Sequence, residues 1–290
     1  SLTAMDHDFG ANHKTLLTFS DGTKIAASIV LACDGTFSTV RTLQSDIATT
    51  GTINNATKPF LIDEQKTVWR GTTPNINTRG MSTFYIAQDE ANVKGATANI
   101  FPAGRTTDGS SLSIIMPTSL PGRATGSEDA RQRLKQALAS LDVPIEPALL
   151  EAVEDVDYML EHKLHVRDFD AYPNLYSGCD RLAYMGDSAH PLRPTGEGVT
   201  LALEDAWTIG KLASAQLSTG SDNILSPEKL RQYEQERQDR VLAVCQAVRD
   251  LAESYYENEE EGGKKKTKVQ TTKAGVKQAM KDFPILLETI

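Results

Sequence analysis

The stretch from residue 182 to 206, LAYMGDSAHPLRPTGEGVTLALEDA, constrains the fold of this 290-residue chain more than any other. It opens with four apolar residues, a run long enough for a buried strand and too short for a helix. Gly186 and Asp187 then leave the strand, and Gly196 and Gly198 precede a run of helix-forming residues. The pattern predicts a strand, a tight turn and a helix, with one carboxylate at the carboxyl end of the strand.

The chemistry of this turn suits a ligand with two different ends. Glycines at a helix start let the backbone approach a ligand closely, and the N–H groups there favour an anionic or electron-rich group. A carboxylate such as that of Asp187 suits a hydroxyl donor, for example on a ribose or a ribitol chain. A polyol beside an electron-rich ring describes a flavin.

This stretch resembles the Gly-Asp motif of the FAD-dependent aromatic hydroxylases, the class A flavoprotein monooxygenases. In that family the aspartate binds the ribityl chain, and the Gly-x-Gly turn and helix start lie beside the pyrimidine edge of the flavin. The residues that match the motif are Gly186, Asp187, Ala189, His190, Pro194, Gly196, Gly198, Asp205 and Ala206.

Two residues depart from the family pattern. Glu197 stands where the family usually has Gln, and Thr200 where it usually has Asn, so the ring edge gains a negative charge. The resemblance implies that FAD is bound through Gly186, Asp187, Pro194, Gly196, Glu197, Gly198, Val199 and Thr200.

A second motif follows a long apolar run near the start of the chain. Residues 16–19, 20–23 and 24–33 predict a strand, a turn and a second strand, the latter apolar enough to be buried on both faces. The next eight residues, DGTFSTVR, resemble the family's Asp-Gly motif, and Ser38 is expected to cap a short helix. The resemblance places Asp34 and Arg41 near the middle of FAD and implies a role in pyridine-nucleotide use.

The fingerprint that holds the ADP half of FAD in this family does not occur in the sequence. That unit is a strand–G-x-G-x-x-G–helix, and the first four glycines of this chain stand alone. By analogy with the family, on the order of a hundred residues are expected ahead of Ser1. The chain therefore reads as the carboxyl-terminal part of a monooxygenase, and two explanations stay open: a truncated sequence, and a real loss of the unit.

Residues 51–170 predict a substrate-side domain. Short β-type runs separated by Gly, Pro, Asn and Asp indicate an antiparallel sheet. Helices are expected from Ser127, as N-cap, and at 146–160, with a strand at 163–169.

Trp69-Arg70-Gly71 resembles a W-R-G found in salicylate hydroxylase-like and epoxidase-like branches of the family. Trp69 is favoured as a core aromatic and Arg70 as a surface charge. The hypothesis that Arg70 orients an anionic substrate stays open.

The predicted fold class is α/β (α+β). A partial Rossmann-like FAD/NAD(P)-binding domain occupies residues 1–50 and continues at 171–256, and a mostly antiparallel β-sheet domain is inserted at 51–170. Residues 257–290 form a charged linker and tail.

The end of the second FAD-binding segment predicts a long packing helix. Ser226 and Pro227 suit its N-cap and first position, and Tyr233, Arg237 and Arg240 resemble the closing helix of the family. Its charged residues are expected to be solvated.

Composition excludes several other classes. A net charge of -9 argues against nucleic acid as a partner. The three cysteines, Cys33, Cys179 and Cys245, form no paired framework, which favours free thiols in the cytoplasm or another reducing compartment. The longest apolar run, residues 25–33, is too short for a transmembrane segment.

Two rival sites carry little weight. His162 and His165 have no further ligand at metal spacing, so no metal is expected. Asp187, Ser188 and His190 lack the G-x-S-x-G elbow of a hydrolase and lie too close along one turn for a triad, so His190 is favoured as a structural residue.

The resemblance implies that NAD(P)H reduces FAD, that O₂ forms a C4a-hydroperoxyflavin, and that a small aromatic or isoprenoid substrate is hydroxylated or epoxidised. No catalytic acid or base is predicted, because the cofactor carries the chemistry. Two alternatives stay open: another FAD oxidoreductase of the same fold, and a non-catalytic remnant that acts as a binding module.

Overall fold

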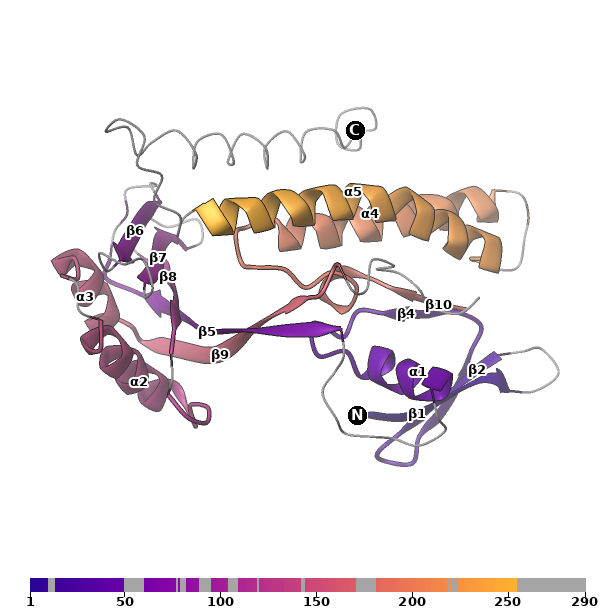
Figure 1. Cartoon of the computed structure of the whole chain (residues 1–290). Helices are drawn as coiled ribbons and strands as arrows, with labels where there is room; N and C mark the ends of the chain where they lie inside the picture. The colour runs from indigo at the N-terminus through magenta and orange to yellow at the C-terminus, as the bar shows by residue number, and fades with distance from the viewer. Residues whose placement is uncertain are drawn as a thin grey trace. The chain divides into compact units, whose positions relative to one another are not determined.

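The chain divides into two compact units, which are described separately (Figure 1). The first comprises Ser1–Ile62 and His165–Glu253, and the second comprises Asp63–Leu164. A computed structural model describes residues 1–9, 14–49, 60–76, 78, 82–88, 95–103, 109–118, 120–141, 144–170, 181–218, 220 and 224–254. The predicted charged tail at 257–290 and Cys179 lie outside these residues.

The first unit contains two sheets and the helices that follow their strands. Strands β1, β2 and β3 form an antiparallel sheet, and β4 pairs with β10 in parallel, which brings together two distant parts of the sequence. The elements are β1 (Leu2–Phe9), β2 (Lys14–Phe19), β3 (Lys24–Ala27), β4 (Val30–Ala32), α1 (Thr39–Thr49), β10 (Leu182–Tyr184), the 3-10 turn η1 (Gly186–Ser188), α4 (Gly198–Leu217) and α5 (Pro227–Ser254).

The single strand predicted over residues 24–33 is wrong. The run divides into β3 and β4, which belong to different sheets. Because β3 is an edge strand, its side chains are largely exposed, and Ile25 keeps 48% of its surface in solvent. An apolar run predicts extended backbone, but it does not show where the chain bends from one sheet into the next.

Helices α4 and α5 pack on the β4–β10 pair to form the core of the first unit. The predicted stripe along α5 is confirmed, because its apolar members are buried. The Tyr233 hydroxyl donates to the carbonyl oxygen of Tyr184 at 3.0 Å, which fixes α5 to β10. No helix within the described residues has the length and apolar character needed to cross a membrane. The stripe consists of Leu230, Tyr233, Arg237, Val241, Val244, Cys245, Val248 and Leu251.

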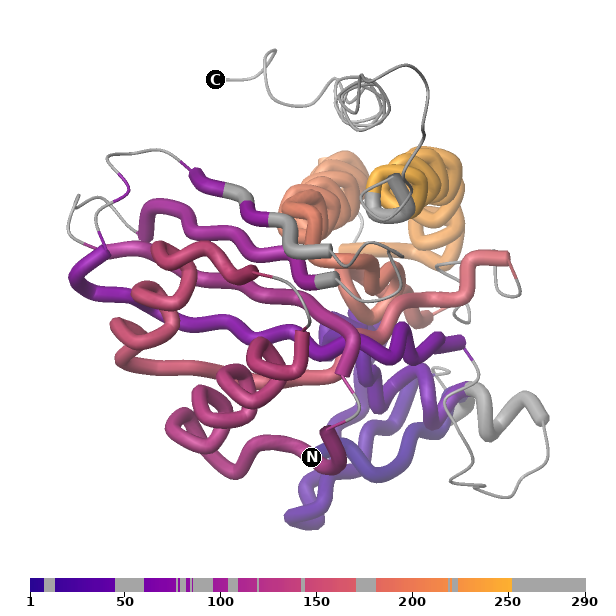
Figure 2. The backbone as a smooth tube through the Cα atoms, turned by 60° about the vertical axis from the view of Figure 1, so that its left-hand side comes forward, coloured from indigo at the N-terminus to yellow at the C-terminus, as the bar shows by residue number. Residues whose placement is uncertain are grey.

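The second unit is a five-stranded sheet with the order β6-β7-β8-β5-β9. The antiparallel pairings of β5 with β8, β7 with β8, and β6 with β7 confirm the predicted sheet type. Helices α2 and α3 cover one face of this sheet (Figure 2). The elements are β5 (Leu61–Thr73), β6 (Thr83–Gln88), β7 (Gly95–Pro102), β8 (Ser110–Pro117), α2 (Ser127–Ala139), α3 (Pro147–Glu154) and β9 (Tyr158–Arg167).

The second helix of this unit is shorter than predicted. It ends at Glu154, and the predicted helical residues 158–160 open β9. The Asp155 carboxylate accepts from the backbone N–H of Asn75 at 2.9 Å, and Asp157 accepts from the Thr72 hydroxyl. These contacts with residues at and just beyond the end of β5 favour the end of α3 at Glu154 over its continuation through residues 155–160.

Ser127 does not cap α2 as predicted. The N-cap is Gly126, and the Ser127 hydroxyl accepts from the backbone N–H of Met159 at 2.8 Å. Trp69, by contrast, is fully buried in the core between sheet and helices, as expected, and its indole N–H donates to Glu161 at 3.2 Å.

Gly71 of β5 should not tolerate a side chain. A Cβ there would lie 2.9 Å from the carbonyl oxygen of Tyr158 and 3.1 Å from Val156. We expect Gly71→Ala to lower the free energy of unfolding by about 1–3 kcal/mol, the usual cost of overpacking. Urea unfolding measures this, with Gly109→Ala as the control, because a Cβ at Gly109 meets its neighbours only at 3.8 Å or more. Equal effects of the two variants would contradict the assignment.

Candidate functional site

The turn after β10 requires glycine at its first position. Gly186 has a φ of +57°, and a Cβ there would lie 3.2 Å from the Cβ of Ala202 in α4. A side chain would therefore meet both backbone strain and the facing helix. This close approach brings the turn directly against α4.

Hydrogen bonds of the Ser188 side chain hold the turn in place. Its hydroxyl is shared between the carbonyl oxygens of Ala32 and Met185, and it accepts from the Met185 N–H at 3.1 Å. Because Ser188 is buried and bonded to backbone, it links β4 to β10 and does not present a nucleophile.

Asp187 and the start of α4 come together as one exposed surface. The Asp187 side chain is exposed, and its Oδ1 lies 3.9 Å from the point where a Cβ on Gly198 would be. Gly196 adopts a φ of +115°, which residues with side chains rarely do. No side chain caps the first turn of α4, and Val199 and Thr200 are exposed there. The predicted carboxylate and the predicted helix start are therefore adjacent.

Glu197 is the N-cap residue of α4, and its carboxylate accepts from the Thr195 hydroxyl. Pro194, which directly precedes Thr195, is half-buried. The negative charge that Glu197 adds to the motif thus lies at the start of α4, where the carboxylate is hydrogen-bonded to Thr195.

The Asp-Gly segment forms its own cap. Asp34 accepts through Oδ2 from the backbone N–H groups of Thr39 at 2.7 Å and Val40 at 3.1 Å. Ser38 accepts from the N–H of Arg41 at 3.0 Å, which confirms the predicted cap. Since these three N–H groups are satisfied within the protein, the start of α1 is less suited to an anion than the start of α4.

Arg41 joins the two motifs. Its guanidinium lies 3.7 Å from the centre of the Tyr184 ring, and its Nε donates to the carbonyl oxygen of Ser188 at 2.9 Å. Only 8% of the residue is exposed, and this burial lowers the pKa of its guanidinium to about 10. The Arg41 side chain therefore contacts both β10 and the turn at Ser188.

A buried ion network lies beneath the turn. Asp205 accepts from the Gly186 N–H at 2.8 Å and from Arg237 Nε at 2.7 Å, and its Oδ2 lies 2.8 Å from His190 Nε2. Burial tends to raise the pKa of Asp205, but the His190 hydrogen bond, the nearby charges and the Gly186 N–H outweigh it and lower that pKa. Asp205 thus connects the turn to both long helices.

Most charged residues of α5 are exposed or half-buried, as predicted, but Arg237 is not. Arg237 is 0% exposed, and its Nη1 donates to Glu204 at 2.9 Å, where Arg240 also binds. A sequence signal for this existed: Arg237 falls within the apolar stripe of α5, so it needed a buried acid, and the pair Glu204-Asp205 supplies two.

Arg70 belongs to the second unit. It is exposed on the sheet face opposite Trp69 and the covering helices. Burial and the positive charge of Arg70 lower the pKa of His162. The structure thus places a cation near a histidine on the sheet face that α2 and α3 do not cover, called the open face below.

Comparisons with known proteins agree on one fold. The sequence model of a family described as FAD binding domain matches residues 1–248. Among curated proteins no sequence matches this chain. Solved structures do: tetracycline destructase Tet(51) matches with a TM-score of 0.63 at 14% identity, over 100% of this chain and 69% of its own.

Two further structures resemble the chain at low identity. HpxO of Klebsiella pneumoniae, solved with FAD and uric acid, has a TM-score of 0.63 at 19% identity, over 97% of this chain and 62% of its own. PqsL of Pseudomonas aeruginosa, described as a probable FAD-dependent monooxygenase, has a TM-score of 0.59 at 19% identity, over 96% of this chain and 66% of its own. The chain therefore spans between 62% and 69% of the length of these three structures.

Proposed function

The chain belongs to the FAD-binding domain family of class A flavoprotein monooxygenases, and from this premise we propose that its first unit binds the riboflavin part of FAD in an FAD-dependent monooxygenase. The observation that carries the proposal is the placement of the exposed Asp187 carboxylate beside the start of α4, which no side chain caps.

The residues present fit a flavin. Gly196 and Gly198 leave space that a side chain would fill, so backbone and ring can approach closely. No side chain caps the first turn of α4, and uncapped N–H groups at a helix start favour an electron-rich edge. Asp187 can accept a hydrogen bond from a ribityl hydroxyl.

We assign different roles to the two residues proposed for the middle of FAD. Asp34 is exposed, and one of its carboxylate oxygens is engaged by α1, so its other oxygen can accept from the cofactor. Arg41 is proposed to act by holding the Ser188 carbonyl, because its guanidinium lies among protein groups.

When bound, FAD would accept a hydride from NAD(P)H and activate O₂ toward a small organic substrate. The part of the chain is to bind, orient and shield that cofactor. Arg70, exposed on the open sheet face, is proposed to contact an anionic group of the substrate. The uric acid in the HpxO structure supports a small organic substrate for this fold.

The test is a titration of the purified chain with FAD, followed by the flavin absorbance bands at about 370 and 450 nm. We expect Asp187→Ala to weaken FAD binding by about 10- to 100-fold, the effect of losing a hydrogen bond to a charged group. Arg70→Ala should leave FAD binding unchanged, since it lies in the other unit. Equal flavin contents in the two variants would refute the assignment.

Two further outcomes separate the alternatives. NAD(P)H consumption that is the same with and without O₂ indicates a reductase. A folded chain that never perturbs the FAD spectrum would show that these residues form only part of an FAD site. Binding of a partner by such a chain would favour the binding module, the alternative that the negative charge of Glu197 at the helix start also favours.

A further inference from the structure

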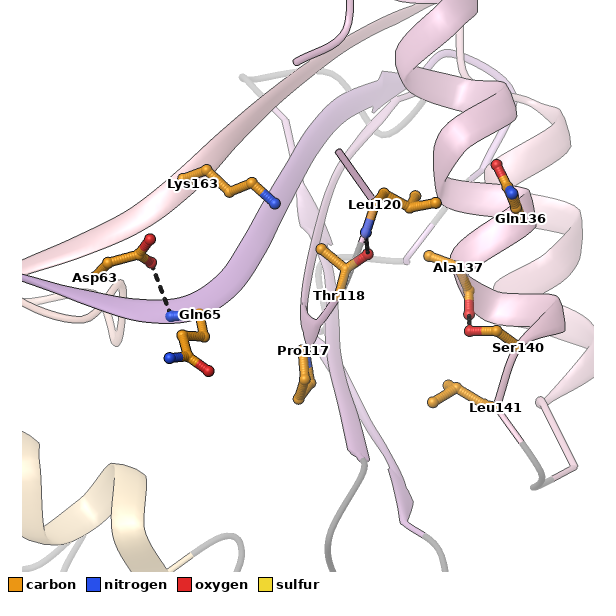
Figure 3. A pocket seen from close by; sticks show the side chains of 10 residues that line it. All are labelled: Asp63, Gln65, Pro117, Thr118, Leu120, Gln136, Ala137, Ser140, Leu141 and Lys163. Atoms are coloured by element: carbon orange, nitrogen blue, oxygen red, sulfur yellow. Dashed lines mark hydrogen bonds between the residues drawn. The ribbon is translucent and has the colours of Figure 1, made fainter. Parts of the chain in front are cut away.

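We propose that the second unit carries a separate binding site for a small organic anion with an apolar body. The site is a cavity of about 650 Å³ between α2 and the adjoining parts of β5, β8 and β9 (Figure 3). Its volume falls within the range of about 300–1,000 Å³ that is usual for small-molecule sites. The residues that line it are Asp63, Gln65, Pro117, Thr118, Leu120, Gln136, Ala137, Ser140, Leu141 and Lys163.

Strand β5 is distorted where it borders the cavity. Gln65 has a φ of +54°, the only positive value at a non-glycine residue in the described part of the chain. The Asp63 carboxylate stabilises this conformation by accepting from the Gln65 N–H at 2.8 Å. Pairing of β5 with β8 begins only at the next residue, Lys66, opposite Pro117. Because β8 ends at Pro117, residues 61–65 of β5 have no partner on β8, and Asp63 and Gln65 border the cavity there.

The wall on the side of α2 is apolar and firmly held. Leu120 and Leu141 project toward the space between strand and helix (Figure 3). Thr118 accepts from the Leu120 N–H at 3.2 Å, and Ser140 donates to the Ala137 carbonyl oxygen at 2.7 Å. Because these hydroxyls order the backbone on both sides, the wall is preformed for an apolar group.

Lys163 supplies the charge. Its ammonium donates to the hydroxyl of Thr67 at 3.0 Å, and it is the one cation among the lining residues. Thr67 is fully buried in the sheet, and the lysine side chain reaches it by lying along the sheet. The ammonium group at its end lines the cavity (Figure 3). Asp63 lies on the neighbouring strand at the exposed rim. One cation with an acid nearby suits a ligand with a single negative charge and disfavours a dianion.

This site is distinct from the proposed flavin and substrate groups. All its lining residues belong to the second unit. On β9, Lys163 alternates with His162, so it lies on the helix-covered face together with Glu161, whereas Arg70 lies on the open face. A ligand at Lys163 and one at Arg70 are therefore on opposite faces of the same sheet.

Hexanoate is a suitable probe, because it joins a carboxylate to a short apolar chain. Isothermal titration of the full chain should give one site with a Kd of about 0.1–1 mM. Hexanamide, its neutral analogue, should bind at least about 10-fold more weakly, and hexylammonium should not bind.

Variants locate the site. Lys163→Gln should weaken hexanoate about 10-fold or more, and Gln136→Trp, on the exposed surface of α2, should abolish binding by filling the cavity. Arg123→Gln, at an exposed arginine of the same unit outside the lining, is the matched control and should leave the affinity unchanged. Circular dichroism of each variant establishes that it is folded.

The proposal is overturned if hexanamide or hexylammonium binds as well as hexanoate, or if Gln136→Trp has no effect. It is also overturned if Arg70→Gln removes binding, which would place the anion on the open face. These results do not depend on FAD, so they are separable from failure of the proposed function.

Discussion

Replacing Arg237 by alanine is expected to lower the free energy of unfolding of the first unit by about 3–5 kcal/mol, the cost of leaving buried acids without their partner. Its guanidinium binds Asp205 at 2.7 Å and Glu204 at 2.9 Å, and neither acid has much access to water. The substitution would leave two carboxylates in a region of low dielectric.

Urea unfolding followed by circular dichroism measures this change. The matched control is Arg231→Ala on the same helix, where the ion pair with Glu228 is exposed at both partners. An exposed pair of this kind contributes about 0–1 kcal/mol. If the two substitutions lower the free energy of unfolding equally, the buried network contributes no more to stability than an exposed ion pair does.

The strand, turn and helix around Asp187 were predictable because short-range chemistry dictates them. An apolar run ends in glycine, an acid follows, and a second pair of glycines opens an amphipathic helix. Ser38 was predictable for the same reason, since a cap acts within one turn of its helix.

The failures all concern contacts between residues distant in the sequence. The bend between β3 and β4 depends on which sheet each strand joins. The early end of α3 depends on contacts of Asp155 and Asp157 with residues about 80 positions away. The burial of Arg237 depends on acids more than 30 residues away on α4. Periodicity within a segment carries no information about such partners.

Arg41 illustrates a further limit. A motif shows which residues occur together, but it does not separate those that touch a ligand from those that hold the site in shape. The structure places the Arg41 side chain against Tyr184 and Ser188, among groups of the protein. A residue that contacts the cofactor and a residue that supports the site leave the same pattern in the sequence.

The second large effect concerns Asp205 and pH. Its pKa in the folded chain is lowered, whereas the pKa of an aspartate in the unfolded chain is about 3.9. A lowered folded pKa means that the carboxylate stabilises the fold fully above the unfolded value, and that this stability is lost as the pH falls through the folded value. We therefore expect Asp205→Asn to cost about 3–5 kcal/mol at pH 7 and progressively less in acid below about pH 4.

Unfolding free energies of both proteins at a series of pH values test this expectation. The control is Asp250→Asn, at an exposed acid of the same unit. Its unfolding free energy should stay close to that of the original chain at every pH. A difference in unfolding free energy between Asp205→Asn and the original chain that does not depend on pH would show that lost packing, rather than lost charge, is responsible. Because Asp205 also holds the Gly186 N–H, the variant should bind FAD more weakly at pH 7 as well. Loss of stability together with full FAD affinity would mean that the turn keeps its shape without the network beneath it.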